Sequence, residues 1–118
     1  MLGLSFKPHT DDLRDSAAVD VAHRLVDLGV HVRAHDPCAL PRARRELAGT
    51  DIELCESPLD LADEADALFL ATEWPQYRDL PWDELGSHMR QRVLVDGRNF
   101  LDRPTIQGCG FRYVGFGR

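Results

Sequence analysis

The sequence has few cysteines and no excess of basic residues. Its three cysteines, Cys38, Cys55 and Cys109, are widely spaced and form no CxxC pair. An odd number at such spacing argues against a disulfide framework or a zinc site. Acidic residues outnumber Lys and Arg by 20 to 14, giving a formal net charge of −6. We therefore expect no broad surface for nucleic acid or an anionic membrane.

Long apolar runs are also lacking. No stretch could cross a bilayer, and the N-terminus does not have the basic-then-apolar layout of a signal peptide. Together with reduced thiols, this predicts a soluble, cytoplasmic protein. The 118 residues, 43% of them hydrophobic, suffice for one domain with one core. An apolar strand pattern starts almost at the first residue, so we expect residues 1–118 to be a single domain cut from a longer protein.

Short apolar runs alternate with helical patterns along the chain. We expect strands over 1–6, 30–34, 52–55, 66–72, 92–96 and 111–115, helices over 17–28, 41–47, 58–65 and 82–89, and a turn near Pro104. A strand, a helix and a strand in close succession force the two strands to lie parallel. The uninterrupted apolar run 66–72 suits a central strand, and 52–55 suits an edge. The predicted fold class is α/β: a Rossmann-like, doubly wound, mainly parallel sheet of five to six strands with helices on both faces.

The loop after the first strand has no glycine between Phe6 and Ser16. A dinucleotide fingerprint needs glycines there, so that backbone amides can approach a pyrophosphate. We therefore do not expect this domain to be the main NAD-binding unit. A nucleotide would be held through side-chain charges and backbone at the strand ends.

Charged side chains follow several of the expected strands. Parallel strands end at one rim, so residues 6–7, 36, 72–74 and 96–98 should become neighbours. Lys7 and Arg98, from separate strand ends, and Arg14 in the first loop are suited to binding phosphates.

Each of these residues also has a purely structural interpretation. Lys7 could be a solvated lysine, and Arg98 a turn arginine, although Gly97 favours a binding role. Arg14 could pair with an aspartate of its own loop. Asp36 occupies the position of a ribose-binding acid, but without the glycines a cap or structural bond is favoured. The aromatic residues that follow the 66–72 run are expected to pack: Trp74, Tyr77 and Trp82.

The first loop and helix carry the pattern Gly-x-x-Phe-Lys-x-x-Thr-x-Asp-x-Arg-x-Ser from Gly3 to Ser16. Four further motifs follow in order: Asp36-Pro37, Thr72-Glu73-Trp74, Asp96-Gly97-Arg98-Asn99 and Gly115-Phe116-Gly117-Arg118. Through these motifs essentially the whole chain resembles the C-terminal UDP-binding domain of the UDP-glucose/GDP-mannose dehydrogenase family, above all of its UDP-glucose 6-dehydrogenases.

The resemblance implies a role for each matching residue. Phe6 and Lys7 would contact the nucleotide sugar, Arg98 its uridine or diphosphate, and Arg14 would reach NAD held mainly by another domain. Enzymes of this family oxidise the sugar's primary alcohol to a carboxylate in two hydride transfers to NAD, through a thioester on a cysteine.

That cysteine belongs to a glycine-rich motif for which this chain has no counterpart. We therefore expect no catalytic residue and no metal ligand here, and a chain that is inactive alone. Its expected partners are a UDP-sugar and its own N-terminal NAD-binding and central domains, in an enzyme that forms homodimers or larger oligomers. Two alternatives stay open: a dehydrogenase for UDP-N-acetylmannosamine or GDP-mannose, and a stand-alone, non-catalytic nucleotide-binding module.

Overall fold

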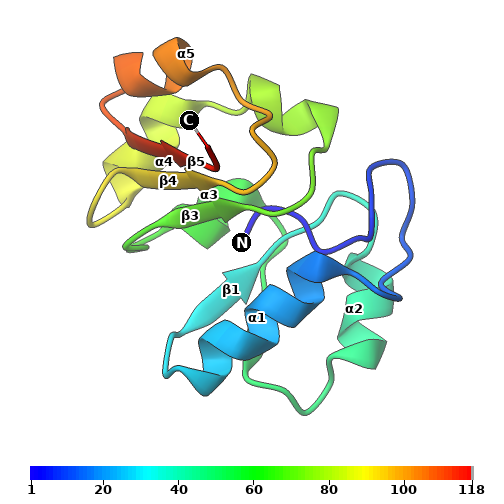
Figure 1. Cartoon of the computed structure of the whole chain (residues 1–118). Helices are drawn as coiled ribbons and strands as arrows, with labels where there is room; N and C mark the ends of the chain where they lie inside the picture. The colour runs from blue at the N-terminus through cyan, green and yellow to red at the C-terminus, as the bar shows by residue number, and fades with distance from the viewer. Residues whose placement is uncertain (118) are drawn as a thin grey trace.

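The strands form one parallel array. The computed structural model describes residues 1–117, so Arg118 of the closing motif lies outside the described residues. Strands β1 (Val32–Ala34) and β2 (Ile52–Leu54) pair with each other, as do β3 (Leu68–Leu70), β4 (Val93–Asp96) and β5 (Arg112–Gly115) in the order β3-β4-β5. Leu2 joins the two groups through parallel bridges to His35 and Leu70. Figure 1 shows the N-terminal segment running between β1 and β3.

The resulting order is β2, β1, the N-terminal segment, β3, β4, β5. Numbered along the chain, this is the 3-2-1-4-5-6 order of a doubly wound nucleotide-binding fold. The predicted fold class is confirmed, with β2 at an edge and β3 in the interior. The chain reverses its winding between the N-terminal segment and β3, which is the topological switch point of the sheet.

The first strand is much shorter than the predicted 1–6. Only Leu2 is bridged on both sides, because Gly3 adopts a φ of +100°. A Cβ on Gly3 would lie 2.5 Å from the Cβ of Thr72, so this glycine allows two backbones to touch. The bend ends the regular ladder and brings the next residues against the end of β3.

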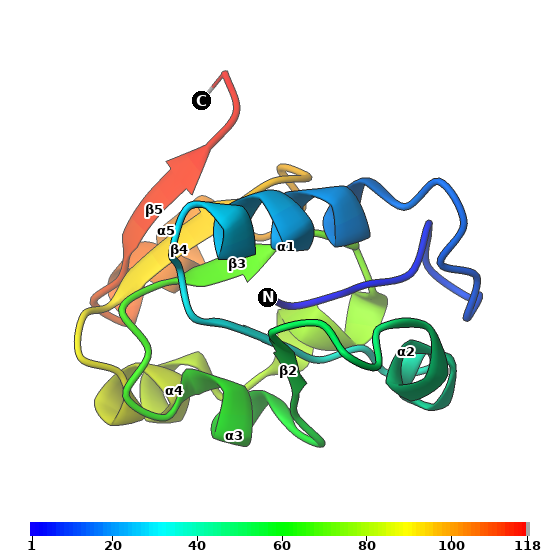
Figure 2. The ribbon, with the colours of Figure 1, turned by 90° about the horizontal axis from the view of Figure 1, so that it is seen from below.

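Helices cover both faces of the sheet. They are α1 (Ala17–Asp27), α2 (Leu40–Glu46), α3 (Pro58–Ala62), α4 (Trp82–His88) and α5 (Arg103–Gly108), with a 3-10 helix η1 (Pro75–Asp79). Figure 2 shows α1 on one side of the strands and α3 and α4 on the other. The helix α5 replaces the turn expected near Pro104. This helix is short, and the sequence feature that favours it is the N-cap Asp102, whose Oδ2 accepts from the backbone N–H of Thr105 over 3.1 Å.

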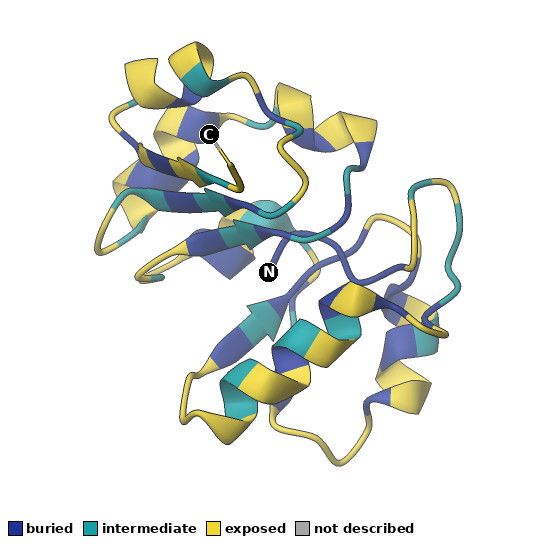
Figure 3. Ribbon diagram, in the orientation of Figure 1, coloured by how far each residue is buried: buried dark blue, intermediate teal, exposed yellow. Residues whose placement is uncertain are grey.

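Alternating residues of β3 serve two hydrophobic clusters. Leu68 and Leu70 join the cluster that includes residues of α3, α4 and α5, whereas Phe69 packs on the cluster beneath α1 and α2. Burial follows the sheet and the inner sides of the helices (Figure 3). The predicted packing role of three aromatic residues is confirmed, since all three are buried: Trp74, Tyr77 and Trp82. Within residues 1–117, no helix is both long and apolar enough to span a membrane.

Candidate functional site

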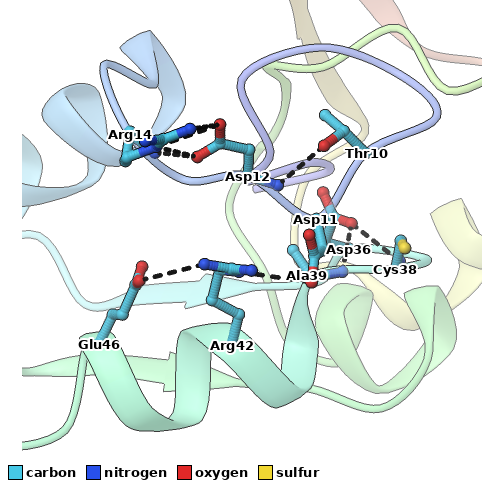
Figure 4. Close-up of polar contacts among 9 residues, drawn as sticks. All are labelled: Thr10, Asp11, Asp12, Arg14, Asp36, Cys38, Ala39, Arg42 and Glu46. Atoms are coloured by element: carbon cyan, nitrogen blue, oxygen red, sulfur yellow. Dashed lines mark hydrogen bonds and ion pairs between the residues drawn. The ribbon is translucent and has the colours of Figure 1, made fainter.

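The end of the first strand is fixed by a buried aspartate. Asp36 Oδ2 accepts hydrogen bonds from the backbone N–H groups of Leu4 and Ser5, each over 2.9 Å, and from Ser5 Oγ over 3.0 Å. Its Oδ1 accepts from the backbone N–H groups of Cys38 and Ala39, the start of α2 (Figure 4). Residues 6 and 7 therefore follow directly after a stretch of backbone that is firmly held.

Asp36 is already occupied as an acceptor. Burial pushes the pKa of its carboxyl group upward, but four backbone N–H donors outweigh burial and hold the pKa below its ordinary value. Both oxygens are engaged, so the carboxylate has no free side for a ribose hydroxyl. The structural role predicted for Asp36 is confirmed.

Phe6 and Lys7 lie just beyond this anchor, at the carboxyl end of the strand. The Phe6 backbone N–H donates to Asp12 O over 2.7 Å, yet its side chain is exposed, with 54% of the residue accessible. Lys7 is also exposed, and among residues 1–117 its ammonium group has no hydrogen bond or ion pair. Both side chains are thus available to a ligand.

Arg14 makes a local ion pair. Its Nη2 lies 3.0 Å from Asp12 Oδ2 and its Nε 3.1 Å from Asp12 Oδ1, as Figure 4 shows. Hydrogen bonds from the Arg14 side chain and backbone lower the pKa of Asp12 to about 2. The Arg14 side chain is still 84% exposed. The pairing of Arg14 within its own loop is therefore observed, and the guanidinium remains accessible from solvent.

Thr72 and Trp74 join the first strand to the end of β3. Thr72 Oγ1 donates to Ser5 O over 2.9 Å, and Trp74 Nε1 donates to Ser5 Oγ over 3.1 Å. Both residues are buried. These bonds lie at the switch point, where ligands of doubly wound sheets bind.

Arg98 lies just after the end of β4, next to Glu73, which follows β3. Its backbone N–H donates to Asp96 Oδ1 over 3.1 Å, and its Nε donates to Glu73 Oε2 over 2.8 Å. Gly97 has no positive φ, so its role is contact: a Cβ there would lie 2.9 Å from Leu70 O. The Arg98 side chain is 47% exposed.

These contacts bring most of the predicted residues together. The bond between Ser5 and Thr72 joins the first strand to β3, and the bond between Glu73 and Arg98 joins β3 to β4. Phe6, Lys7 and Arg98 therefore follow the ends of strands that meet at one rim, while Arg14 lies on the outer loop. Sequence reasoning placed Glu73 at this rim but gave it no role. Its position directly after the central strand 66–72 could have indicated that its carboxylate lies close to a cation of the rim.

A hollow in the described surface lies elsewhere. A groove of about 740 Å³ runs along the opposite edge of the sheet, where strands begin, and its lining includes Met1, Val30, Val32, Ala67 and Leu68. None of the predicted site residues lines it. Its lining includes two arginines, but Arg33 donates to the backbone carbonyls of Asp60 and Asp63, and Arg90 pairs with Glu64. The groove also lies away from the carboxyl ends of the strands, where ligands of doubly wound sheets bind.

Comparison with known proteins finds relatives over the whole chain. The chain is 43% identical over its whole length to the UDP-glucose 6-dehydrogenase of Rhizobium meliloti, of which it spans 26%. A UDP-glucose dehydrogenase structure from Pyrobaculum islandicum matches 84% of this chain and 21% of its own with 42% identity and a TM-score of 0.70. A UDP-D-ManNAc dehydrogenase structure from Pyrococcus horikoshii matches 99% of this chain and 24% of its own with 30% identity and a TM-score of 0.78.

The chain thus spans about a quarter of the length of the curated relatives it matches. A family model described as the UDP-glucose/GDP-mannose dehydrogenase family, UDP binding domain, matches residues 1–103. The strand order, the motifs and this match together show that the chain belongs to the UDP-glucose/GDP-mannose dehydrogenase family, as its UDP-binding domain.

Proposed function

We propose that this chain is the UDP-binding domain of a UDP-glucose 6-dehydrogenase, which oxidises UDP-glucose to UDP-glucuronate with two NAD. In this proposal residues 1–118 are one domain of a longer cytoplasmic enzyme, which supplies the N-terminal NAD-binding and central domains. The observation that carries the proposal is the meeting of three strand ends at the switch point, linked by the bonds from Thr72 to Ser5 and from Arg98 to Glu73.

The substrate's diphosphate would lie above this rim. Lys7 would contribute a mobile ammonium and Arg98 a planar guanidinium, which can contact two phosphate oxygens at once. Phe6, largely exposed and next to Lys7, would contribute an apolar contact to the nucleotide sugar. The local cations matter because the chain as a whole is acidic, at −6, so an anion must be held by neighbouring charges.

The residues of this domain do not fit a principal NAD site. Ser16 caps α1, accepting from the Val19 backbone N–H while its Oγ donates to Leu4 O over 2.6 Å. One backbone N–H of that helix N-terminus, where a pyrophosphate would bind, is therefore already paired within the chain. Asp36 is likewise fully engaged. NAD would be held by another domain, and the exposed Arg14 is the residue of this chain that we propose reaches it.

Other nucleotide sugars are the main competing substrates. The identities of 43% and 42% to two UDP-glucose dehydrogenases exceed the 30% to the UDP-D-ManNAc dehydrogenase, which favours UDP-glucose. Activity of the full-length enzyme that contains this chain, assayed on UDP-glucose, UDP-N-acetylmannosamine and GDP-mannose, would separate these possibilities.

A chimera gives a direct test. The matching segment of the Rhizobium meliloti enzyme is replaced by this chain, and NADH formation from UDP-glucose is followed. We expect Lys7→Ala and Arg98→Ala each to raise the KM for UDP-glucose about 10-fold or more, because each removes a charge-assisted hydrogen bond to phosphate. Arg24→Ala is the matched control. This exposed arginine lies in the last turn of α1, which leads to the start of β1 and not to a carboxyl end of a strand. An unchanged KM in both site variants would refute the assignment.

A further inference from the structure

Arg98 has a fixed counter-ion. Its Nε donates to Glu73 Oε2 over 2.8 Å, although the two residues are 25 positions apart and follow different strands. Among residues 1–117 this is the one hydrogen bond or ion pair that the guanidinium makes. An isolated surface pair of this kind usually contributes little to stability. Its position at the switch point calls for a different explanation.

The backbone of Glu73 lies between two buried neighbours that are themselves held by hydrogen bonds. Thr72 Oγ1 donates to Ser5 O, and Trp74 Nε1 donates to Ser5 Oγ and to Asp36 Oδ2 over 3.2 Å. The Trp74 backbone N–H also donates to Thr72 O over 2.9 Å. Only 28% of the Glu73 side chain is exposed. Glu73 therefore projects from a rigid backbone, unlike a freely rotating surface glutamate.

The other end of the arginine is fixed as well. Its backbone N–H is bound by the buried carboxylate of Asp96, and Gly97 packs against Leu70 O. The side chain thus runs between its own held backbone and the Glu73 carboxylate to which its Nε is bonded. An arginine held in this way loses less side-chain entropy when it binds a ligand.

The geometry also determines which edge of the guanidinium is presented. A guanidinium can grip a phosphate through two parallel N–H donors. With Nε engaged by Glu73, the pair of terminal nitrogens, Nη1 and Nη2, is left for the ligand. From this we infer that Glu73 is a positioning residue, which holds Arg98 with its terminal nitrogens directed at the diphosphate of the nucleotide sugar. The inference rests on the proposed function, and it adds a residue that touches the ligand only through Arg98.

Glu73 also has a cost, because a carboxylate near the site repels the phosphates. If repulsion dominated, removing Glu73 would tighten binding. We expect positioning to dominate, since the Glu73 charge is neutralised by its bond to Arg98 and since exposed charges are screened by solvent. The two effects predict opposite signs, so an experiment can separate them.

The test is a double-mutant cycle in the chimeric enzyme, with UDP-glucose as the substrate. We expect Glu73→Ala to raise the KM for UDP-glucose about 3- to 10-fold and to leave kcat within about 2-fold. Glu73→Gln keeps an acceptor for Nε and removes the charge, so its KM should stay within about 3-fold of the parent. In an Arg98→Ala background, Glu73→Ala should no longer raise KM, and should lower it to the extent that the unpaired carboxylate repels the phosphates.

Three outcomes would overturn the inference: a lower KM in Glu73→Ala, an equal rise in KM with and without Arg98, or no effect of Arg98→Ala itself. An equal rise would assign Glu73 a purely structural role, which the melting temperature of each variant would report independently. Glu56→Ala is the matched control, because Glu56 makes an exposed ion pair with Arg44 beyond the edge strand β2. Lys7→Ala still reports on the proposed function if the Glu73 cycle fails, so the two failures are distinguishable.

Discussion

Two aspartates hold the two sides of the rim, and their surroundings differ. Asp36 follows β1 and Asp96 ends β4, and both are buried to about the same degree. Each accepts several backbone N–H donors at the carboxyl end of a parallel strand. Asp36 holds the backbone just before Lys7, and Asp96 holds the backbone of Arg98. The two thus share a position in the fold and a chemical role.

Their donors come from different places. Asp96 accepts from its own following turn, through the backbone N–H groups of Arg98, Phe100 and Leu101, and from Tyr113 Oη on the neighbouring strand. Asp36 accepts from the N-terminal segment, from the start of α2 and from the indole of Trp74. One carboxylate therefore closes a local turn, and the other ties together three segments across the switch point.

The largest effect should follow loss of Asp36. Asp36→Ala would leave four backbone N–H groups without their acceptor, three of them in buried residues, and would remove one of the two acceptors of the Trp74 indole. We expect a loss of roughly 3–5 kcal/mol in the free energy of unfolding, measured by urea denaturation. Hydrogen exchange should accelerate on both sides of the switch point, at Leu4, Ser5, Cys38 and Ala39. Exchange confined to one segment would contradict the bridging role.

Loss of Asp96 should cost less and act locally. Asp96→Ala removes four hydrogen bonds that all lie within the turn after β4 or on β5. We expect a loss of roughly 2–3 kcal/mol, with hydrogen exchange accelerating in residues 97–101 and in β5 while Leu4 and Ser5 stay protected. A loss equal to that of Asp36→Ala, with exchange spread over the sheet, would remove the distinction between the two.

Much of the fold could be predicted from the sequence because it depends on short-range patterns. The apolar run of β3 indicated an interior strand, and successive strand-helix-strand units left parallel pairing as the only simple solution. The same rule placed the strand ends of Lys7, Thr72 and Arg98 at one rim. What failed was local backbone detail: the early end of the first strand at Gly3 and the short helix α5. Gly3 bends because of a contact with Thr72, which is visible only after the strands are placed.

The site was predicted less completely, for a related reason. Asp36 was expected to have a structural role, but its bond to Trp74 joins residues 38 positions apart. The pair of Glu73 and Arg98 likewise depends on the register of β3 against β4 and on two side-chain rotamers. Single-residue patterns do not encode such pairs. They show which charges reach the rim and leave open which of them bind each other.

The smallest effect should come from one hydroxyl at the switch point. Thr72→Val keeps the side-chain shape but removes the donor to Ser5 O, leaving a buried carbonyl unpaired. We expect a loss of about 1 kcal/mol in the free energy of unfolding. The matched control is Thr50→Val, because Thr50 Oγ1 also donates to a carbonyl, Leu47 O over 2.7 Å, but within one exposed turn after α2. Water can replace that local bond, so its loss should stay below about 0.5 kcal/mol. Equal losses in urea denaturation would mean that the bond from Thr72 to Ser5 stabilises the sheet no more than an exposed turn does.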